Sequence, residues 1–229
     1  MLAKDVNNTN RDNPKESLSI ILKAMEMKSE LLRKTEINSF EDFRKVTESI
    51  FYIKRHYEEL VKENSLSSIS QAYSILKDES LSYDERVKRF NQMIRLEDEQ
   101  SDVRDMAREV IHFLYPEKYP LWTRWIWNES ARSGSLTYIL KDNVSINNEE
   151  EFFSAVNELK GVLDVFGLDL NNYYATSIFL VYAYVRYVDY TTLLAIDRKA
   201  GGLYPTHLAT TSLVLGLKPF LKVIQLAHT

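Results

Sequence analysis

The chain has 229 residues, of which 45% are hydrophobic and 27% are charged, proportions that exclude a disordered protein and fit an ordinary globular one. Its formal net charge of -4 provides no overall attraction to nucleic acid or to anionic lipid, so either would need a local patch of positive charge. Cysteine is absent, which excludes disulfides, thiolate metal sites and a cysteine nucleophile and suits a reducing cytoplasm.

Glycine and proline are scarce, with 6 and 5 residues, and this favours long helices because sheet-rich folds need many turns. The first residues are polar and lack the apolar stretch of a signal peptide, so we expect residues 1–13 to be a flexible tail. Residues 14–229 are predicted to form a single all-α domain of seven to nine helices. The best candidate for a division within it is the loop 130–147.

Several helices of the N-terminal half begin at recognisable signals and continue with apolar residues at three-to-four spacing. Asn13 is a cap residue and Pro14 suits the first helical position, so the first helix begins there. Ser39 opens a second helix, whose apolar side runs as far as Tyr57. A shorter helix follows at 67–76.

Two further helices of this half have clear boundaries. Ser82 and Glu85 are spaced as in a capping box, in which each side chain binds a backbone N–H at the helix start. The next helix runs from Ser101 to Leu114 and must end before Pro116, because proline disfavours helical geometry in the residue that precedes it. Helices of this kind have one apolar side and need a partner surface.

The middle of the chain predicts less regular structure. Pro120 suits the start of a short helix, whose spacing would place four apolar side chains on one side: Leu121, Trp122, Trp125 and Ile126. The loop that follows contains at most a short strand at 136–140. Asn148 and the three glutamates after it are a strong helix start, because carboxylates favour the positive end of the helix dipole. This helix is expected to run to Phe166, with Gly167 as its left-handed terminator.

The C-terminal portion is much the more apolar, since residues 168–229 contain only five basic and three acidic residues. It predicts a long helix at 170–195, a turn at Gly201 and Gly202, and a last helix at 206–225. Thr206 would cap the last helix and Pro219 would kink or break it. We expect this pair of apolar helices to form the centre of the domain, with the other helices packed around it.

The run 173–196 is long enough to span a bilayer, but Arg186 and Asp189 would then lie within the span, where each is costly. Three residues apart, they share one helical face and can pair with each other or with a neighbour. We therefore predict a soluble protein in which this helix is buried, and no contact with a membrane.

The segment 113–128 contains all three tryptophans of the chain, and two hypotheses account for it. In the first, tryptophan rings beside arginine and lysine side chains hold single-stranded nucleic acid, or clamp an aromatic or phosphorylated small molecule. The candidate contacts are Trp122, Arg124, Trp127, Arg132, Lys118 and Arg108. In the second, the large rings only pin an irregular segment between helices.

The charge around the tryptophans decides between these hypotheses. Five basic and five acidic residues lie between Ser101 and Ser135, so the neighbourhood is neutral. Phosphate binding depends on unbalanced positive charge. We therefore favour the packing interpretation.

Glu109 and His112 form an E-x-x-H pattern that places a carboxylate and an imidazole on one helical face, with Asp105 one turn earlier. Helical di-iron proteins use two such motifs and two further glutamates, but this chain has no second motif. The pattern is therefore a weak metal candidate. A histidine at the edge of the core, hydrogen-bonded to a neighbour, is the simpler interpretation, and we expect no metal and no cofactor.

The sequence contains neither the G-x-S-x-G pattern of a nucleophile elbow nor a phosphate-binding glycine loop. We therefore predict a non-enzymatic cytoplasmic binding or scaffold protein that acts through protein–protein contacts, with a partner or with itself. The low charge of the C-terminal portion favours an interface there. The first alternative is a nucleic-acid-binding or processing protein that uses the segment 118–132. The second is a small-molecule or metal-binding enzyme with its site near Trp122, Glu109 and His112.

Overall fold

The computed structural model describes residues 14–140, 144–168, 170–195, 214–217, 219–220 and 223. Within these ranges the protein is all-α, as predicted, with eight α-helices, two short 3-10 helices and no strand. The α-helices are α2 (Pro14–Lys34), α3 (Phe40–Glu48), α4 (Tyr57–Glu63), α5 (Leu66–Lys77), α6 (Tyr83–Met93), α7 (Gln100–Leu114), α8 (Glu149–Val165) and α9 (Tyr174–Ala195). The 3-10 helices are η1 (Lys54–His56) and η2 (Ser135–Tyr138).

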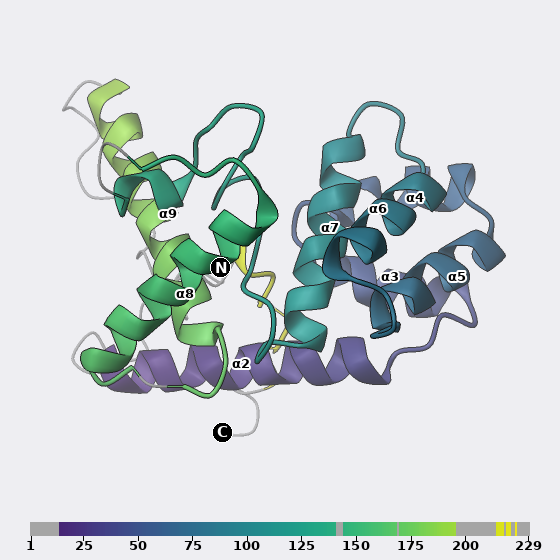
Figure 1. Ribbon diagram of the computed structural model, residues 1–229. Coiled ribbons are helices and arrows are strands. Elements are labelled where there is room, and N and C mark those ends of the chain that lie inside the picture. Colours follow the sequence, from purple (N-terminus) through teal and green to yellow (C-terminus); the bar gives the residue numbers. More distant parts are fainter. Residues whose placement is uncertain are drawn as a thin grey trace.

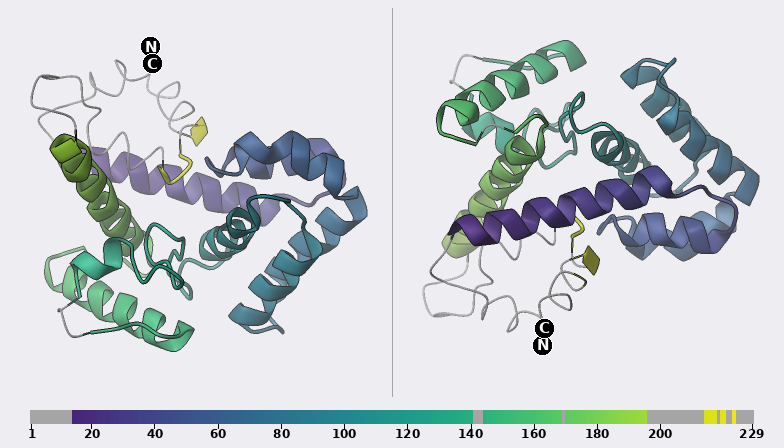
Figure 2. Two further views of the ribbon diagram at one scale, coloured as in Figure 1. Left: turned by 90° about the horizontal axis from the view of Figure 1, so that it is seen from above. Right: turned by 90° about the horizontal axis from the view of Figure 1, so that it is seen from below.

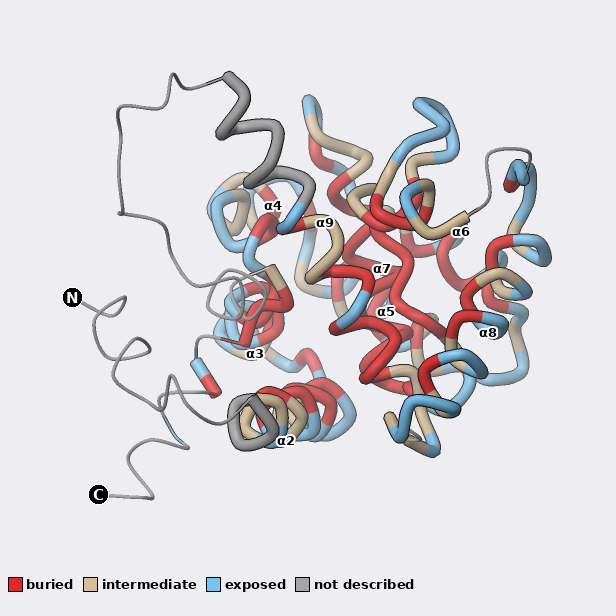
Figure 3. Tube along the Cα trace, turned by 90° about the vertical axis from the view of Figure 1, so that its left-hand side faces the viewer, coloured by how far each residue is buried: buried red, intermediate tan, exposed pale blue. Residues whose placement is uncertain are grey.

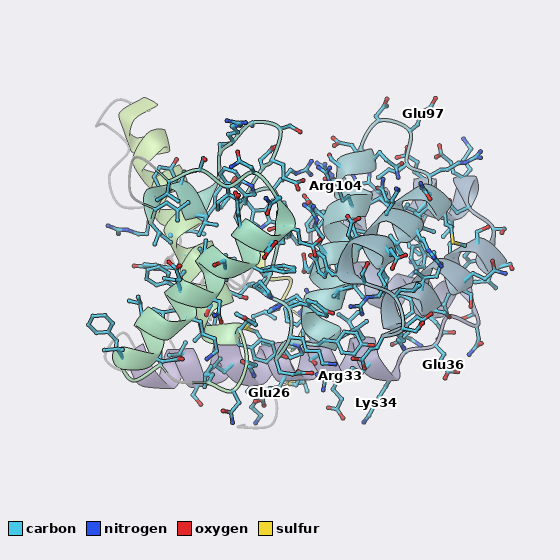
Figure 4. The ribbon with its side chains drawn as sticks, in the orientation of Figure 1. Glu26, Arg33, Lys34, Glu36, Glu97 and Arg104 are labelled. Atoms are coloured by element: carbon cyan, nitrogen blue, oxygen red, sulfur yellow. The ribbon has the colours of Figure 1, made fainter. Side chains whose placement is uncertain are left out.

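The helices form two groups that share one long helix. Helices α3 to α7 lie together on one side, whereas α8, α9 and η2 lie on the other, and α2 runs along the base of both (Figure 1). Views from above and below show α9 crossing between α8 and α2, and α9 packs against both (Figure 2). Of the α2 side chains that are labelled in Figure 4, Glu26 and Lys34 point away from the body of the protein, whereas Arg33 donates to the carbonyl of Leu114 at the end of α7.

The predicted helix boundaries are largely confirmed, because most of them are set by local hydrogen bonds. Ser39 accepts a hydrogen bond from the backbone N–H of Asp42, and Ser82 and Glu85 form the capping box. Asn148 caps α8 in the same way. At the other end of α8, Gly167 has a φ of 79°, and the backbone N–H of Leu168 donates to the carbonyl of Leu163 over 3.1 Å.

One predicted helix is broken in the structure. The apolar spacing from Ser39 to Tyr57 predicts a continuous helix, but α3 ends at Glu48 and irregular turns follow. The hydroxyl of Thr47 donates to the carbonyl of Arg44, and that of Ser49 donates to the carbonyl of Val46 over 2.7 Å. These side chains compete with the backbone for helical acceptors and favour a break.

The segment after α7 also differs from the prediction. No helix begins at Pro120; the backbone makes a single turn in which Ile126 and Trp127 both donate to the carbonyl of Thr123. The predicted strand at 136–140 is wrong as well, since Ser135–Tyr138 forms η2. Both the backbone N–H and the hydroxyl of Thr137 donate to the carbonyl of Gly134, which favours a turn over an extended strand.

The most deeply buried helix of the described part is α7, in which twelve of fifteen residues are buried (Figure 3). From the expected C-terminal pair, α9 contributes buried residues such as Leu180 and Val181, but most of 206–225 lies outside the described residues. Leu215 and Leu217 are buried too. Between them, Gly216 has a φ of 66°, and a Cβ added there would lie 2.0 Å from the carbonyl oxygen of Ser49, so only glycine fits.

None of the described helices is both long enough and apolar enough to cross a bilayer. Arg186 is exposed, and the side chain of Asp189 lies outside the described residues, as do the tail 1–13, the turn at Gly201 and Gly202, and Thr206. The interruption expected at Pro219 occurs just before it, in the turn that contains Gly216. A division of the chain at 130–147 stays a prediction.

Candidate functional site

The buried face of α7 carries five ionisable side chains, which could form a reactive site only if they were free of structural partners: Asp102, Asp105, Arg108, Glu109 and His112. The carboxylate of Glu109 and the ammonium group of Lys28 from α2 are 2.5 Å apart, and both side chains are buried. Lys28 also donates to the carbonyl of Leu215 over 2.9 Å, and its nitrogen lies 4.3 Å from the centre of the Phe113 ring. Burial lowers the pKa of Lys28, whereas the charge of Glu109 raises it. Glu109 is therefore one half of a structural ion pair.

His112 makes its hydrogen bonds to Tyr119 and Ser177, and not to Glu109. Its Nδ1 donates to the carbonyl of Tyr119 over 2.8 Å, which leaves Nε2 to accept from the hydroxyl of Ser177 at 3.3 Å. Burial lowers the pKa of His112 to about 4, so the ring is neutral at pH 7. Nowhere in the described ranges do three His, Cys, Asp or Glu side chains gather so that they could hold a metal ion.

Asp102 and Asp105 lie one turn apart on α7 and share a single cation from the tryptophan segment. Arg124 forms ion pairs with both carboxylates, and its backbone N–H lies 3.4 Å from Oδ2 of Asp105. Arg55 is a further partner of Asp102, at 3.2 Å. Burial raises the pKa of Asp105 to about 7, although the backbone N–H of Arg124 lowers it. Oδ1 of Asp105 and the buried hydroxyl of Tyr52 have no hydrogen-bond partner among the residues that the structure describes.

The tryptophan rings of the predicted nucleic-acid contact lie mainly inside the protein. Trp122 is only 1% exposed and stacks on Phe152 of α8 with ring centres 4.2 Å apart, while the guanidinium group of Arg108 lies 3.8 Å from its other face. Trp127 is buried as well, and its carbonyl accepts from the indole N–H of Trp122 over 3.2 Å. Both faces of Trp122 are thus occupied within the chain.

The basic residues of the same prediction are spread over different contacts. Arg108 pairs with Glu129 at 3.2 Å, and Arg104, which Figure 4 labels on α7, lies 3.9 Å from the same carboxylate. Lys118 pairs with Glu79. Arg132 is exposed on the loop after Glu129 and has a φ of 48°. The structure therefore brings Arg108 and Trp122 together, but it does not gather the six candidates on one surface.

Trp125 faces away from Trp122, which explains why a short helix with both rings on one side does not form. Its ring centre lies 4.9 Å from that of Tyr52 and 5.7 Å from that of Phe51. Trp122 instead packs toward α8. The segment is therefore anchored on two sides, between the two helix groups, as the packing interpretation predicts.

Two open grooves lie along α2, and neither of them is lined by Trp122, Glu109 or His112. One groove has a volume of about 740 Å³, carries charges of both signs and is lined by Met27, Glu30, Leu31, Lys34, Thr35, Glu36, Asn38, Asp42, Lys45, Phe220 and Val223. A second, of about 480 Å³, lies between α2 and the residues after α7. The second alternative, an enzyme site near Glu109 and His112, is thus not matched by either groove.

A different feature stands out on the surface: the C-terminal end of α8 exposes large apolar side chains. Val162 is 52% exposed, Val165 84% and Phe166 77%. We call these three residues the α8 end surface. The opposite side of the helix is packed in the core through Phe152, Val156, Leu159 and Leu163.

Gly161 lies beside the α8 end surface, in the middle of a regular helix. A Cβ added there would meet nothing within 4 Å, and its backbone is not left-handed, so neither space nor conformation requires glycine. Glycine in a helix interior costs about 0.5–1 kcal/mol relative to alanine. A missing side chain on an exposed helix face instead allows another backbone to approach closely.

The chain was compared with protein-family models, with curated proteins and with solved structures, and none of them matches. Its function must therefore be inferred from its own residues. The α8 end surface was not predicted from the sequence, although one signal was present: Val162 and Val165 lie outside the apolar stripe of the helix, whereas Phe166 continues that stripe at three-residue spacing from Leu163. A helix with apolar residues on both sides has more apolar surface than one core contact covers.

Proposed function

We propose that the chain is a cytoplasmic, non-enzymatic helical protein that binds another protein, and that the α8 end surface is the contact. The observation that carries this proposal is the exposure of Val162, Val165 and Phe166 on neighbouring positions of one helix end. Burying a valine or phenylalanine side chain contributes about 1.5–3 kcal/mol. Nothing in the described part of the chain covers these side chains, so a partner would gain that free energy.

The internal use of the charged residues supports the same proposal. Glu109 is paired with Lys28, and Arg124 with Asp102 and Asp105, so these side chains stabilise the fold. The buried core of a protein interface is depleted in charged residues and enriched in aromatic ones, and the α8 end surface has no charged residue and includes Phe166. Binding of single-stranded nucleic acid and self-association stay predictions, and for the former Lys118 and Arg132 are exposed candidates.

The test compares the full chain with the double variant Val165→Ser/Phe166→Ser, tagged and expressed in the native host. Proteins that co-purify are identified by mass spectrometry, and each candidate is then purified and titrated against the chain by calorimetry. We expect one candidate to bind the unchanged chain and to bind the double variant at least about tenfold more weakly, which corresponds to about 1.4 kcal/mol.

Val144→Ser is the matched control, because Val144 is also exposed but lies before the opposite end of α8. This variant should bind like the unchanged chain. All three proteins should unfold at nearly the same temperature, since the substituted side chains are already in solvent. Equal binding by the unchanged chain and the double variant would overturn the proposal.

A further inference from the structure

We propose that the occupant of the α8 end surface is an amphipathic helix of another protein, with apolar side chains toward Val165 and Phe166 and basic side chains toward Glu158 and Glu150. This inference rests on the proposed function and adds the chemistry and direction of the partner. Three features of the outer face of α8 carry it: the exposed apolar end, the open position at Gly161, and a set of carboxylates along the rest of the face.

The outer face of α8 changes character along its length. Glu150, Ser154 and Glu158 are exposed in the first part, Gly161 follows, and Val165 lies at the far end. Residues at these spacings share one side of a helix. The distance from Glu150 to Val165 is about 22 Å at about 1.5 Å per residue, so a partner helix of about fifteen residues would cover it.

The charge of this face is acidic and unbalanced. Glu150 and Glu158 form no ion pair with any other residue that the structure describes. The nearest lysine on the helix, Lys160, is paired with Asp164 at 3.0 Å. Basic side chains on a partner would therefore meet carboxylates that have no partner of their own, and opposite charges of this kind fix the orientation of binding.

The open position at Gly161 suits a helix as the occupant. Because no atom lies within 4 Å of an added Cβ, a second helix can approach the backbone of α8 at this point. Glycine permits close approach of another backbone, and the distance of about 8–10 Å between packed helices depends on the side chains at the contact. An extended peptide is thinner than a helix and could bind without an open position at Gly161.

A second copy of the chain fits this face poorly. In an antiparallel pair of α8 helices, Glu150 of one copy would lie across from Val165 of the other, and a carboxylate would be desolvated against an apolar side chain. In a parallel pair, Glu158 would face Glu158, and like charges repel. The outer face of α8, which is acidic at one end and apolar at the other, therefore complements a basic and apolar helix better than a second copy of α8.

The test uses two synthetic peptides of about 18 residues, each about 27 Å long as a helix. Both carry leucines on one face at one end and differ only at the other end, which bears four lysines in one peptide and four glutamates in the other. Each is titrated into the full chain, labelled with ¹⁵N, and affinity and contact residues are read from the amide shifts. We expect the lysine peptide to bind about tenfold more tightly and to shift the amides of 150–166.

Three variants of the full chain sharpen this test. Glu158→Lys should weaken the lysine peptide about fivefold and strengthen the glutamate peptide, because the sign of the contact is reversed. Gly161→Leu should weaken both peptides about tenfold while the chain keeps or raises its melting temperature, since leucine is a better helix former. Phe166→Ser should weaken both peptides and leave the melting temperature unchanged.

The outcomes separate this inference from the proposed function. If both peptides bind equally and only Phe166→Ser weakens them, the apolar contact stands and the basic partner is overturned. If Gly161→Leu leaves binding unchanged, a helical occupant is overturned. If Phe166→Ser has no effect on either peptide, the proposed function fails as well. Sedimentation analysis that finds a dimer broken by Phe166→Ser would replace the partner by a second copy.

Discussion

Helices α7 and α8 both depart from the rule that charged residues are exposed and apolar residues buried. On α7 charged side chains are buried, and at the end of α8 large apolar side chains are exposed. The helix α7 places Asp102, Asp105 and Glu109 inside the protein, whereas α8 places Val165 and Phe166 in solvent. The carboxylates of α7 are matched by cations from distant parts of the chain, such as Lys28 and Arg124.

The apolar side chains of α8 have no such match among the described residues. A buried charge that is paired within the chain stabilises the fold. Large apolar side chains that stay exposed indicate a binding partner outside the chain. The comparison therefore separates structural from functional candidates without reference to any motif.

Removing the internal partner of a buried charge should have the greatest effect on stability. Lys28→Met leaves the carboxylate of Glu109 buried and unpaired, so we expect the free energy of unfolding to fall by about 3–5 kcal/mol in urea denaturation. In Lys28→Met/Glu109→Leu both charges are gone, and most of this loss should be recovered. A single variant that loses less than about 1 kcal/mol would show that the pair does not stabilise the fold.

A second prediction concerns the pH dependence of stability. Burial shifts the pKa values of two groups of α7, Asp105 and His112, in opposite directions. The pKa of Asp105 is raised from 3.8 to about 7, so the folded state holds its proton longer, and its contribution to stability decreases as the pH rises from 4 to 7. The pKa of His112 is lowered from 6.5 to about 4, so its contribution increases between pH 4 and 6.5. At about 1.4 kcal/mol per pKa unit, the Asp105 effect amounts to about 4 kcal/mol and the opposite His112 effect to about 3 kcal/mol, so the larger part of each is offset by the other.

Single variants should show the pH dependence of each group separately. In Asp105→Asn the free energy of unfolding should increase from pH 4 to 6.5, because only the histidine effect remains. In His112→Asn, which keeps a donor for the carbonyl of Tyr119, it should decrease from pH 4 to 7. Urea denaturation at steps of pH measures both slopes. Identical slopes in the two variants would contradict the assignment.

The smallest expected effect concerns the exposed helix and distinguishes two glycines of the same region. Gly161→Ala should raise the free energy of unfolding by about 0.5–1 kcal/mol, because the position is helical and open. Gly167→Ala should lower it by about 1 kcal/mol, since Gly167 is just as open but has a φ of 79°. Thermal unfolding of the full chain measures both. A loss of stability in Gly161→Ala would mean that glycine is needed there by the fold itself, and not by a partner.

Much of the secondary structure could be predicted because its causes lie within a few residues of each other. The capping box of Ser82 and Glu85, the cap at Asn148 and the terminator Gly167 are of this kind. The prediction failed where side chains competed with the helix, as at Ser49, or where two rings packed in opposite directions, as at Trp122 and Trp125. Periodicity describes one helix surface at a time and contains no information on what lies opposite.

The all-α class, most helix ends and the neutrality of the tryptophan neighbourhood follow from the amino-acid sequence alone, since composition, spacing and local hydrogen bonds are sufficient for these. Three features follow from tertiary packing: Lys28 pairs with Glu109, 81 positions away, Trp122 lies between Arg108 and Phe152, and Val165 and Phe166 stay in solvent. The physical reason is that burial and pairing depend on which surfaces meet in space, and each surface is formed by residues far apart along the chain.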